Sequence, residues 1–264
     1  MQKIAVLVIA AVNQPVYLSY IRNYWSAAIH HTKQTCRNID IFLLLEHGTP
    51  MSEFKSLGEN VIVDDNADLS CLCDPKLHFP GFPSILSKTI CALDLLQDHY
   101  DVFFRTNLSS LIKLSAFDDY IQSQEKLSYS SAWVWNDGLR EDLQLHNRVG
   151  PGKSIRSLSE LLAYEGNSFA SGAGYFLNAE EAKSLVNRRE MIRYDIVDDV
   201  SVGLMFPNCK ILSGFSAIMT ADQTVDDTVS RIERTPACHI RLQHFPAALA
   251  ENLWGKLKNK SVWQ

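Results

Sequence analysis

The sequence predicts an α/β protein built on a mixed, mostly parallel sheet with helices on both faces. Three observations support this class: apolar runs of strand length, amphipathic helical stretches between them, and short connections. Of the 264 residues, 46% are hydrophobic and 10% are aromatic, which is ample for one large core. Because the composition shifts nowhere sharply, we expect a single domain over residues 1–264.

The first half of the chain alternates strands and helices. Residues 1–11 could pass for a signal peptide, but a buried first strand is favoured, because one lysine is a weak positive region and helical periodicity begins directly after Pro15. Such repeated units form a parallel sheet that binds ligands at the carboxyl ends of its strands. The expected elements are strand 3–11, helix 16–31, strand 39–45, helix 51–57, strand 60–64, helix 84–99 and strand 101–105.

The second half is less regular. Gly-Pro-Gly at 150–152 predicts a loop over residues 138–152. The other expected elements are strand 127–135, helix 157–164, strand 169–177, helix 179–191, strand 211–219, strand 239–243 and helix 247–258.

Charge and apolar run lengths exclude two classes of partner. The net charge is −5 and acids and bases are mixed along the chain, which argues against a nucleic-acid surface. No apolar run approaches the length of a membrane span. Six scattered cysteines are typical of reduced thiols, so we expect a cytoplasmic protein.

Two segments in the second half point to an active site. In the strand expected at 169–177, Ser171-Gly-Ala-Gly replaces bulk with small residues, so that its backbone can approach another group closely. Asp198 and Asp199 then stand at the start of a short apolar helix. Helix capping explains one acid. The other is a candidate general base, because a neighbouring carboxylate raises its proton affinity. The pair favours an enzyme of sugar transfer.

Polar residues at the end of strand 101–105 are a second candidate. Arg105, Thr106 and Asn107 follow a buried run at the edge where α/β sheets bind ligands, although polar turn residues commonly end a strand. The spaced glycines of phosphate-binding and dinucleotide-binding loops are absent, and Ser171 lies in no nucleophile elbow. Trp133 and Trp135 could stack on a sugar, with core packing as the alternative for at least one of them.

Taken together, these segments resemble the GT-A fold glycosyltransferases, most closely glycosyltransferase family 31 and the fringe-like β-1,3-glycosyltransferases. Ser87-Lys88-Thr89 is similar to the L-x-x-K-T helix of that family. Residues 103–107 fall where the family has a strand ending in K-T-D-D-D. Residues 171–176 and 198–203 are similar to its S-G-x-G-Y strand and its E/D-D-V-x-V-G segment. The resemblance covers about residues 84 to 206.

The resemblance implies a nucleotide-sugar-dependent, inverting transfer to a glycan or polysaccharide acceptor, with a UDP-sugar as the donor. Asp199 would then be the general base on the acceptor hydroxyl, and Asp198 would orient it. The donor half would span about residues 1–112 and the acceptor half about 113–264. The expected site residues are Arg105, Thr106, Asn107, Lys88 and Ala11 for the donor, and Ser171, Gly172 and Trp135 for the acceptor.

The chain departs from the family at the metal-binding acids. Their positions hold Asn107, Leu108 and Ser109, and neutral side chains are poor ligands for a hard cation. Either Mn²⁺ or Mg²⁺ is held elsewhere, with Ser109 and His244 as weak candidates, or cations such as Arg105, Lys88 or Arg241 offset the charge of the leaving group. We favour a weak or absent metal requirement.

Two other functions are compatible with these segments. A catalytically degenerate domain of the same fold could bind a sugar or a nucleotide without turning it over. A hydrolase is disfavoured, because the two acids of a glycosidase lie on either side of the bond and adjacent residues cannot do so.

Overall fold

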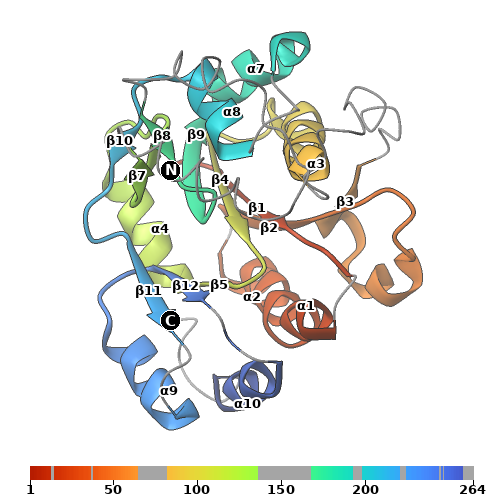
Figure 1. The fold of residues 1–264 in the computed structure, drawn as a ribbon, viewed down its shortest axis with the longest axis vertical. Coiled ribbons are helices and arrows are strands. Elements are labelled where there is room, and N and C mark those ends of the chain that lie inside the picture. The colour runs from red at the N-terminus through yellow and green to blue at the C-terminus, as the bar shows by residue number, and fades with distance from the viewer. Residues whose placement is uncertain are drawn as a thin grey trace, which may run out of the picture.

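A computed structural model describes residues 1–12, 15–36, 38–64, 82–135, 168–192, 198–220, 224–243, 245 and 247–257. Its main sheet has seven strands in the order β10-β6-β9-β4-β1-β2-β3, with helices on both faces (Figure 1). Two smaller sheets, β11-β12-β5 and β7-β8, lie beside it. This architecture confirms the predicted α/β class.

The strands and helices of the first half follow the expected order. They are β1 (Ile4–Ile9), α1 (Pro15–Tyr20), a π-helical segment (Ile21–Trp25), α2 (Ser26–Thr35), β2 (Ile39–Leu45), a 3-10 helix (Met51–Asn60), β3 (Val61–Val63), α3 (Phe82–Leu96), β4 (Val102–Asn107), β5 (Ser110–Ile112) and α4 (Leu114–Ser123).

The second half contains shorter strands. Its elements are β6 (Ser130–Ser131), β7 (Val134–Trp135), β8 (Phe169–Ala170), β9 (Gly174–Asn178), α7 (Ala179–Asn187), a 3-10 turn (Arg189–Met191), α8 (Asp198–Met205), β10 (Lys210–Ile211), β11 (Ser216–Thr220), α9 (Val225–Arg234), β12 (His239–Gln243) and α10 (Ala247–Leu257).

The centre of the main sheet is parallel. β1 pairs in parallel with β2 and with β4, and β2 with β3. β9 runs antiparallel to both β4 and β6. The carboxyl ends of β1, β2 and β4 therefore lie at one edge of the sheet, which is where ligands bind in open α/β folds.

Helices cover both faces of this sheet, so its central strands are apolar on both sides. Ile4, Val6 and Val8 of β1 pack in one core layer with residues of α1, α2, α4, α9 and α10. The alternate residues of β1 pack in the other layer with α3, α7 and α8. This two-sided burial explains why β1 is a continuous apolar run.

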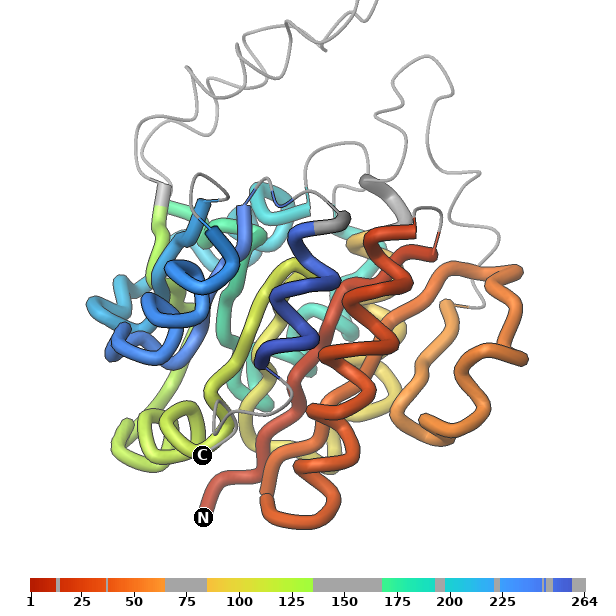
Figure 2. The backbone as a smooth tube through the Cα atoms, turned by 90° about the horizontal axis from the view of Figure 1, so that it is seen from below, coloured from red at the N-terminus to blue at the C-terminus, as the bar shows by residue number. Residues whose placement is uncertain are grey.

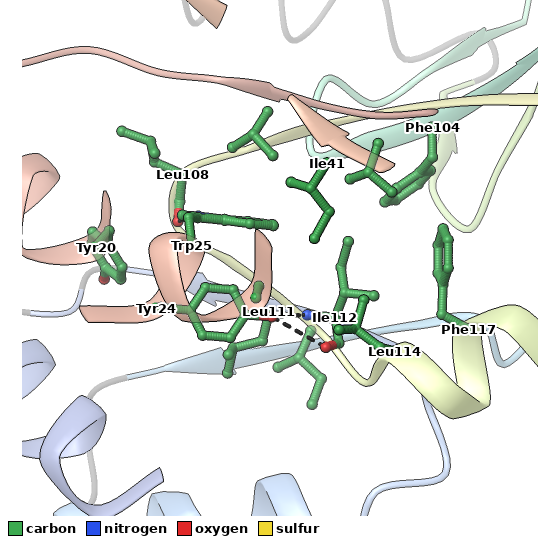
Figure 3. Packing of buried hydrophobic residues seen from close by; sticks show 14 of the residues in the cluster. Tyr20, Tyr24, Trp25, Ile41, Phe104, Leu108, Leu111, Ile112, Leu114 and Phe117 are labelled. Atoms are coloured by element: carbon green, nitrogen blue, oxygen red, sulfur yellow. Dashed lines mark hydrogen bonds between the residues drawn. The ribbon is translucent and has the colours of Figure 1, made fainter. Parts of the chain in front are cut away.

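Two aromatic residues after α1 anchor the chain that follows β4. The Trp25 indole Nε1 donates a hydrogen bond to the Leu108 carbonyl at 2.9 Å, and the Tyr24 hydroxyl accepts one from the Ile112 amide at 2.6 Å (Figure 3). Trp254 of α10 packs on Tyr24, with ring centroids 4.8 Å apart, and α10 runs alongside α1 (Figure 2). The turn after β4 is therefore anchored to the hydrophobic core by these hydrogen bonds.

Three predicted strands are wrong in extent. Residues 127–135 divide between two sheets, because β6 pairs with β9 and β10 whereas β7 pairs with β8. Residues 169–177 break into β8 and β9 at a turn closed by a 3.2 Å hydrogen bond from the Gly174 amide to the Ser171 carbonyl. Residues 211–219 divide between β10 and β11.

One predicted helix is divided in two. The helix expected over residues 179–191 is α7 followed by a separate 3-10 turn. The loop at 138–152 and the helix at 157–164 lie outside the described residues. Of the helices that the structure describes, none has the length and apolarity to cross a membrane.

Candidate functional site

The predicted acid pair lies at the carboxyl end of β4. Asp198 and Asp199 are the first two residues of α8, as predicted. Asp198 accepts a hydrogen bond from Arg105 Nη2 at 2.6 Å, and both side chains are buried. A charge-assisted hydrogen bond of this kind is strong and directional, so it fixes the carboxylate in position. Arg105 therefore joins β4 to the start of α8.

Asp199 has a different environment from Asp198. It is only half-buried, its Oδ2 accepts a 2.9 Å hydrogen bond from the Gly172 amide, and its Oδ1 accepts one from the Val200 amide. Burial, and then the charge of Asp198, raise the pKa of Asp199 from 3.8 to about 6. The two adjacent acids therefore differ: Asp198 is paired with an arginine, whereas Asp199 is held by two backbone amides and has a raised pKa.

The turn at residues 171–173 holds the two acids together. The Gly172 carbonyl accepts hydrogen bonds from Arg105 Nη1 and, at 2.8 Å, from Asn107 Nδ2, while its amide donates to Asp199. A Cβ on Gly172 would lie 3.2 Å from Arg105 Nη1 and 3.3 Å from Asp199 Oδ2. The close approach inferred from Ser171-Gly-Ala-Gly is thus present, although in a turn and not within a strand.

A second close approach lets α8 pack directly against β8. A Cβ on Gly203 would lie 2.3 Å from the Cβ of Phe169, so the helix can lie this near β8 only with glycine at that position. Residues 171–173 and 198–203 are packed against one another, and Asp199 lies beside Gly172. Trp135 pairs with Phe169 through its backbone, and its side chain is outside the described part of the site.

A hydrogen-bonded chain secures the same turn from the opposite face of β4. The Thr106 hydroxyl donates to the Ala173 carbonyl at 3.0 Å, and His239 Nε2 lies 3.1 Å from the Thr106 oxygen. His239 Nδ1 lies 2.8 Å from Ser216 Oγ. Because the single Thr106 proton is already donated, Nε2 carries the imidazole proton and Nδ1 accepts from Ser216. Burial lowers the pKa of His239 to about 3, so the ring is neutral.

Ala11 follows β1, and the ammonium of Lys88, a residue of α3, lies at the carboxyl ends of β1 and β2. Lys88 Nζ donates to the Ala10 carbonyl at 3.0 Å and to Glu46 Oε1 at 3.3 Å. Burial lowers the pKa of Lys88, and the partly exposed Glu46 opposes that shift. Glu46 was not predicted from the sequence. It directly follows β2, much as Arg105, Thr106 and Asn107 close β4, so the same polar strand-end signal could have found it.

The positions expected to hold metal-binding acids do not fit a divalent cation. The Asn107 amide is bonded to Gly172, and Leu108 is buried with its carbonyl bonded to Trp25. Ser109 supplies only a hydroxyl and a carbonyl, and the carbonyl accepts from the Leu242 amide. Across the described ranges no three histidine, cysteine or acidic side chains gather as a metal site, and His244 lies outside those ranges.

Comparison with known proteins gives remote structural matches. No protein-family model and no curated protein sequence matches the chain. Mouse xyloside xylosyltransferase 1 aligns with 92% of this chain and 98% of its own, at 11% identity and a TM-score of 0.44. A glycosyltransferase involved in glycosylation of the major capsid of PBCV-1 aligns with 96% and 99%, at 7% identity and a TM-score of 0.47.

A third match is an active-site mutant of LgtC. It aligns with 96% of this chain and 95% of its own, at 14% identity and a TM-score of 0.44. All three TM-scores are below 0.5, so these matches carry no weight in assigning a reaction. The chemistry has to be judged from the site itself.

Proposed function

We propose that this chain is an inverting glycosyltransferase that moves a sugar from a nucleotide-sugar donor to a hydroxyl of a glycan acceptor, with Asp199 as general base. The observation that carries the proposal is the unequal environment of two adjacent carboxylates. Asp198 is fixed by Arg105 at 2.6 Å, whereas Asp199 is half-buried with a pKa raised to about 6 by burial and by Asp198. Environments that separate two acids in this way assign one of them to proton transfer.

The proposed step transfers one proton and one glycosyl group. A carboxylate oxygen of Asp199 takes the proton of the acceptor hydroxyl while that hydroxyl oxygen forms a bond to the anomeric carbon. The bond from that carbon to the nucleoside diphosphate breaks on the opposite face, and the diphosphate leaves with the electron pair. A pKa near 6 leaves Asp199 ionised at neutral pH and still basic enough to assist.

Other residues of the site are proposed to position the reactants. Gly172 orients Asp199 through its amide, and Ser171 beside it faces the acceptor. Trp135 is proposed to stack on the acceptor sugar. Lys88, on α3, and Ala11, just after β1, line the donor half over about residues 1–112, with a UDP-sugar as the expected donor. Residues 113–264 form the acceptor half.

We propose that Arg105 positions other residues of the site and does not contact the donor directly. Its Nη2 is bonded to Asp198 and its Nη1 to the Gly172 carbonyl. Asn107 donates to the same carbonyl, and Thr106 to that of Ala173. We therefore propose that Arg105, Thr106 and Asn107 position the acid pair and the 171–173 turn.

A non-catalytic domain that binds nucleotides or sugars is the second candidate, and the neutral residues at 107–109 favour it. Slow hydrolysis of a nucleotide-sugar distinguishes the two, since an enzyme activates water weakly when acceptor is missing and a binder does not.

The test starts from calorimetric titration with UDP-, GDP- and dTDP-sugars, each with and without Mn²⁺. Release of nucleoside diphosphate from the tightest donor is then followed for the wild type and two variants. Asp199→Asn is expected to keep donor affinity within about threefold and to lose about 10²- to 10⁴-fold in turnover. Asp226→Asn, an exposed first-turn acid of α9, is the matched control and should retain both. Wild-type turnover in Asp199→Asn would refute the base assignment, and binding without turnover in the wild type would favour the second candidate.

A further inference from the structure

Arg241 is a cation near the candidate site with no described acidic partner. Its Nη1 is buried and has no hydrogen-bond partner within the part of the chain that the structure describes. No salt bridge to Arg241 occurs among those residues either. Arg241 as a whole is half-buried, and a guanidinium withdrawn this far from water is usually paired, because an uncompensated charge is costly to bury. The contacts of the described residues therefore do not explain why an arginine stands at this position.

Arg241 also lies next to the turn that lacks metal-binding acids. In the small sheet it stands opposite Ser110 of β5, one residue after Ser109. The next residue, Leu242, donates its amide to the Ser109 carbonyl at 2.8 Å. Arg241 shares a strand face with His239, two residues earlier, which contacts Thr106 at the end of β4. The guanidinium thus belongs to the edge of the sheet where the donor is proposed to bind.

The other cations that the structure describes at this edge are already paired. Arg105 is bonded to Asp198 and Gly172, and Lys88 to Glu46 and Ala10. Burial, and then the charge of Arg105, lower the pKa of Arg241. The two guanidinium groups are thus close enough to repel each other, and Arg105 occupies the carboxylate of Asp198. Of these three cations, Arg241 is the one that no described carboxylate contacts, so its guanidinium is available to an anion.

We propose that Arg241 binds the diphosphate of the donor and offsets the charge of the leaving group in place of a metal ion. This inference rests on the proposed function. A guanidinium presents paired N–H donors that match phosphate oxygens and is protonated at any physiological pH. As the bond to the anomeric carbon breaks, the departing diphosphate gains negative charge, which Arg241 stabilises without any proton transfer.

A purely structural arginine and an anion-binding arginine differ in their effect on stability. Removing a structural arginine should lower the free energy of unfolding. Removing a half-buried cation that no described carboxylate compensates should leave the free energy of unfolding unchanged or raise it, while the diphosphate binds less tightly. The stability of Arg241→Met without ligand is therefore a readout that separates the two roles.

The experiment compares the wild type with Arg241→Met, Arg241→Lys and the control Arg22→Met, whose arginine forms an exposed surface pair with Glu53. Inorganic pyrophosphate and UDP are titrated by calorimetry in EDTA and again in Mn²⁺, and thermal unfolding is recorded without ligand. In EDTA, Arg241→Met should bind both probes about 10- to 100-fold more weakly, because one charge-assisted contact is lost. Arg22→Met should match the wild type, and the unfolding temperature of Arg241→Met should not fall.

Each other result has a definite meaning. Equal pyrophosphate affinity in Arg241→Met and the wild type overturns the inference and leaves the proposed function standing. Binding by the wild type in Mn²⁺ but not in EDTA does the same, because a metal and not Arg241 would hold the diphosphate. No binding of pyrophosphate or any nucleotide under either condition overturns both. If Arg241→Met does not fold, Arg241→Lys decides: affinity about 3- to 10-fold weaker at unchanged stability supports the inference, and unchanged affinity refutes it.

Discussion

The close packing of α8 against β8 gives the most specific stability prediction, because it leaves no space for a Cβ atom at Gly203. Gly203 lies within α8, five residues after Asp198 and two before the helix ends at Met205. A Cβ at this position would be 2.3 Å from the Phe169 Cβ and 3.2 Å from its Cα, whereas carbon atoms in contact stay about 3.5–4.0 Å apart. The nearest atoms belong to the start of the Phe169 side chain and to its backbone, so they cannot rotate away. In Gly203→Ala, α8 or β8 must shift.

The expected loss of stability is the difference between two opposing effects. Overpacking of a tight core costs about 1–3 kcal/mol, whereas alanine is favoured over glycine within a helix by roughly 1 kcal/mol. Gly203→Ala would bring its Cβ more than 1 Å too close to the Phe169 Cβ, which is fixed by the backbone, so we place its overpacking cost at or above the upper end of that range. We therefore expect a net loss of about 2 kcal/mol. For a chain of this size that corresponds to a fall of roughly 4–8 °C in the unfolding midpoint.

Gly255 in α10 provides the matched control. It is exposed, and a Cβ placed there would meet nothing within 4 Å. Gly255→Ala should therefore show only the helix preference and gain up to about 1 kcal/mol. Urea unfolding monitored by circular dichroism measures both variants. Equal stability changes in the two variants, or a stabilised Gly203→Ala, would refute the close seating of α8.

Three further predictions concern the acid pair and its support. Because the pKa of Asp199 is raised to about 6, the folded protein binds its proton more tightly than the unfolded chain does, so wild-type stability should fall as pH rises from about 4 to 6, by at most about 1.4 kcal/mol per pH unit. Asp199→Asn should lack this slope in urea titrations, and parallel curves would show that Asp199 is not perturbed. Arg105→Met leaves the buried Asp198 without its partner and should cost about 3–5 kcal/mol, part of which the double variant with Asp198→Leu regains; an additive double variant would contradict the pairing. Trp25→Phe deletes the indole donor to the Leu108 carbonyl and should cost about 1–3 kcal/mol by the same assay, so an unchanged midpoint would argue against that anchor.

Much of the parallel half of the fold could be predicted from the sequence. β1, β2 and β4 are apolar on both faces, and such runs have few alternatives once helical periodicity separates them. Asp198 and Asp199 were likewise expected at a helix start, because acids before an apolar run are typical there.

The features that could not be predicted from the sequence depend on contacts between segments that are far apart in the chain. Arg105 and Asp198 are 93 residues apart, and no local pattern indicates that they pair. The break at residues 171–173 was missed because glycine and alanine tolerate an extended strand equally well. The turn is selected by what Gly172 bonds to, namely Arg105 and Asp199. The role of His239 depends in the same way on Thr106 and Ser216, which come from two other strands.

The dependence of donor turnover on pH in the wild type and in Asp199→Asn tests the central claim most directly. The rate of nucleoside diphosphate release would be measured between about pH 4.5 and 8 at saturating donor, a window that spans the expected ionisation. We expect the wild-type rate to rise with pH and level off above about 6, as the Asp199 carboxyl loses its proton, and the variant rate to stay low and flat. A variant that keeps the wild-type rate, or that shows the same inflection, would contradict the assignment of Asp199 as the base.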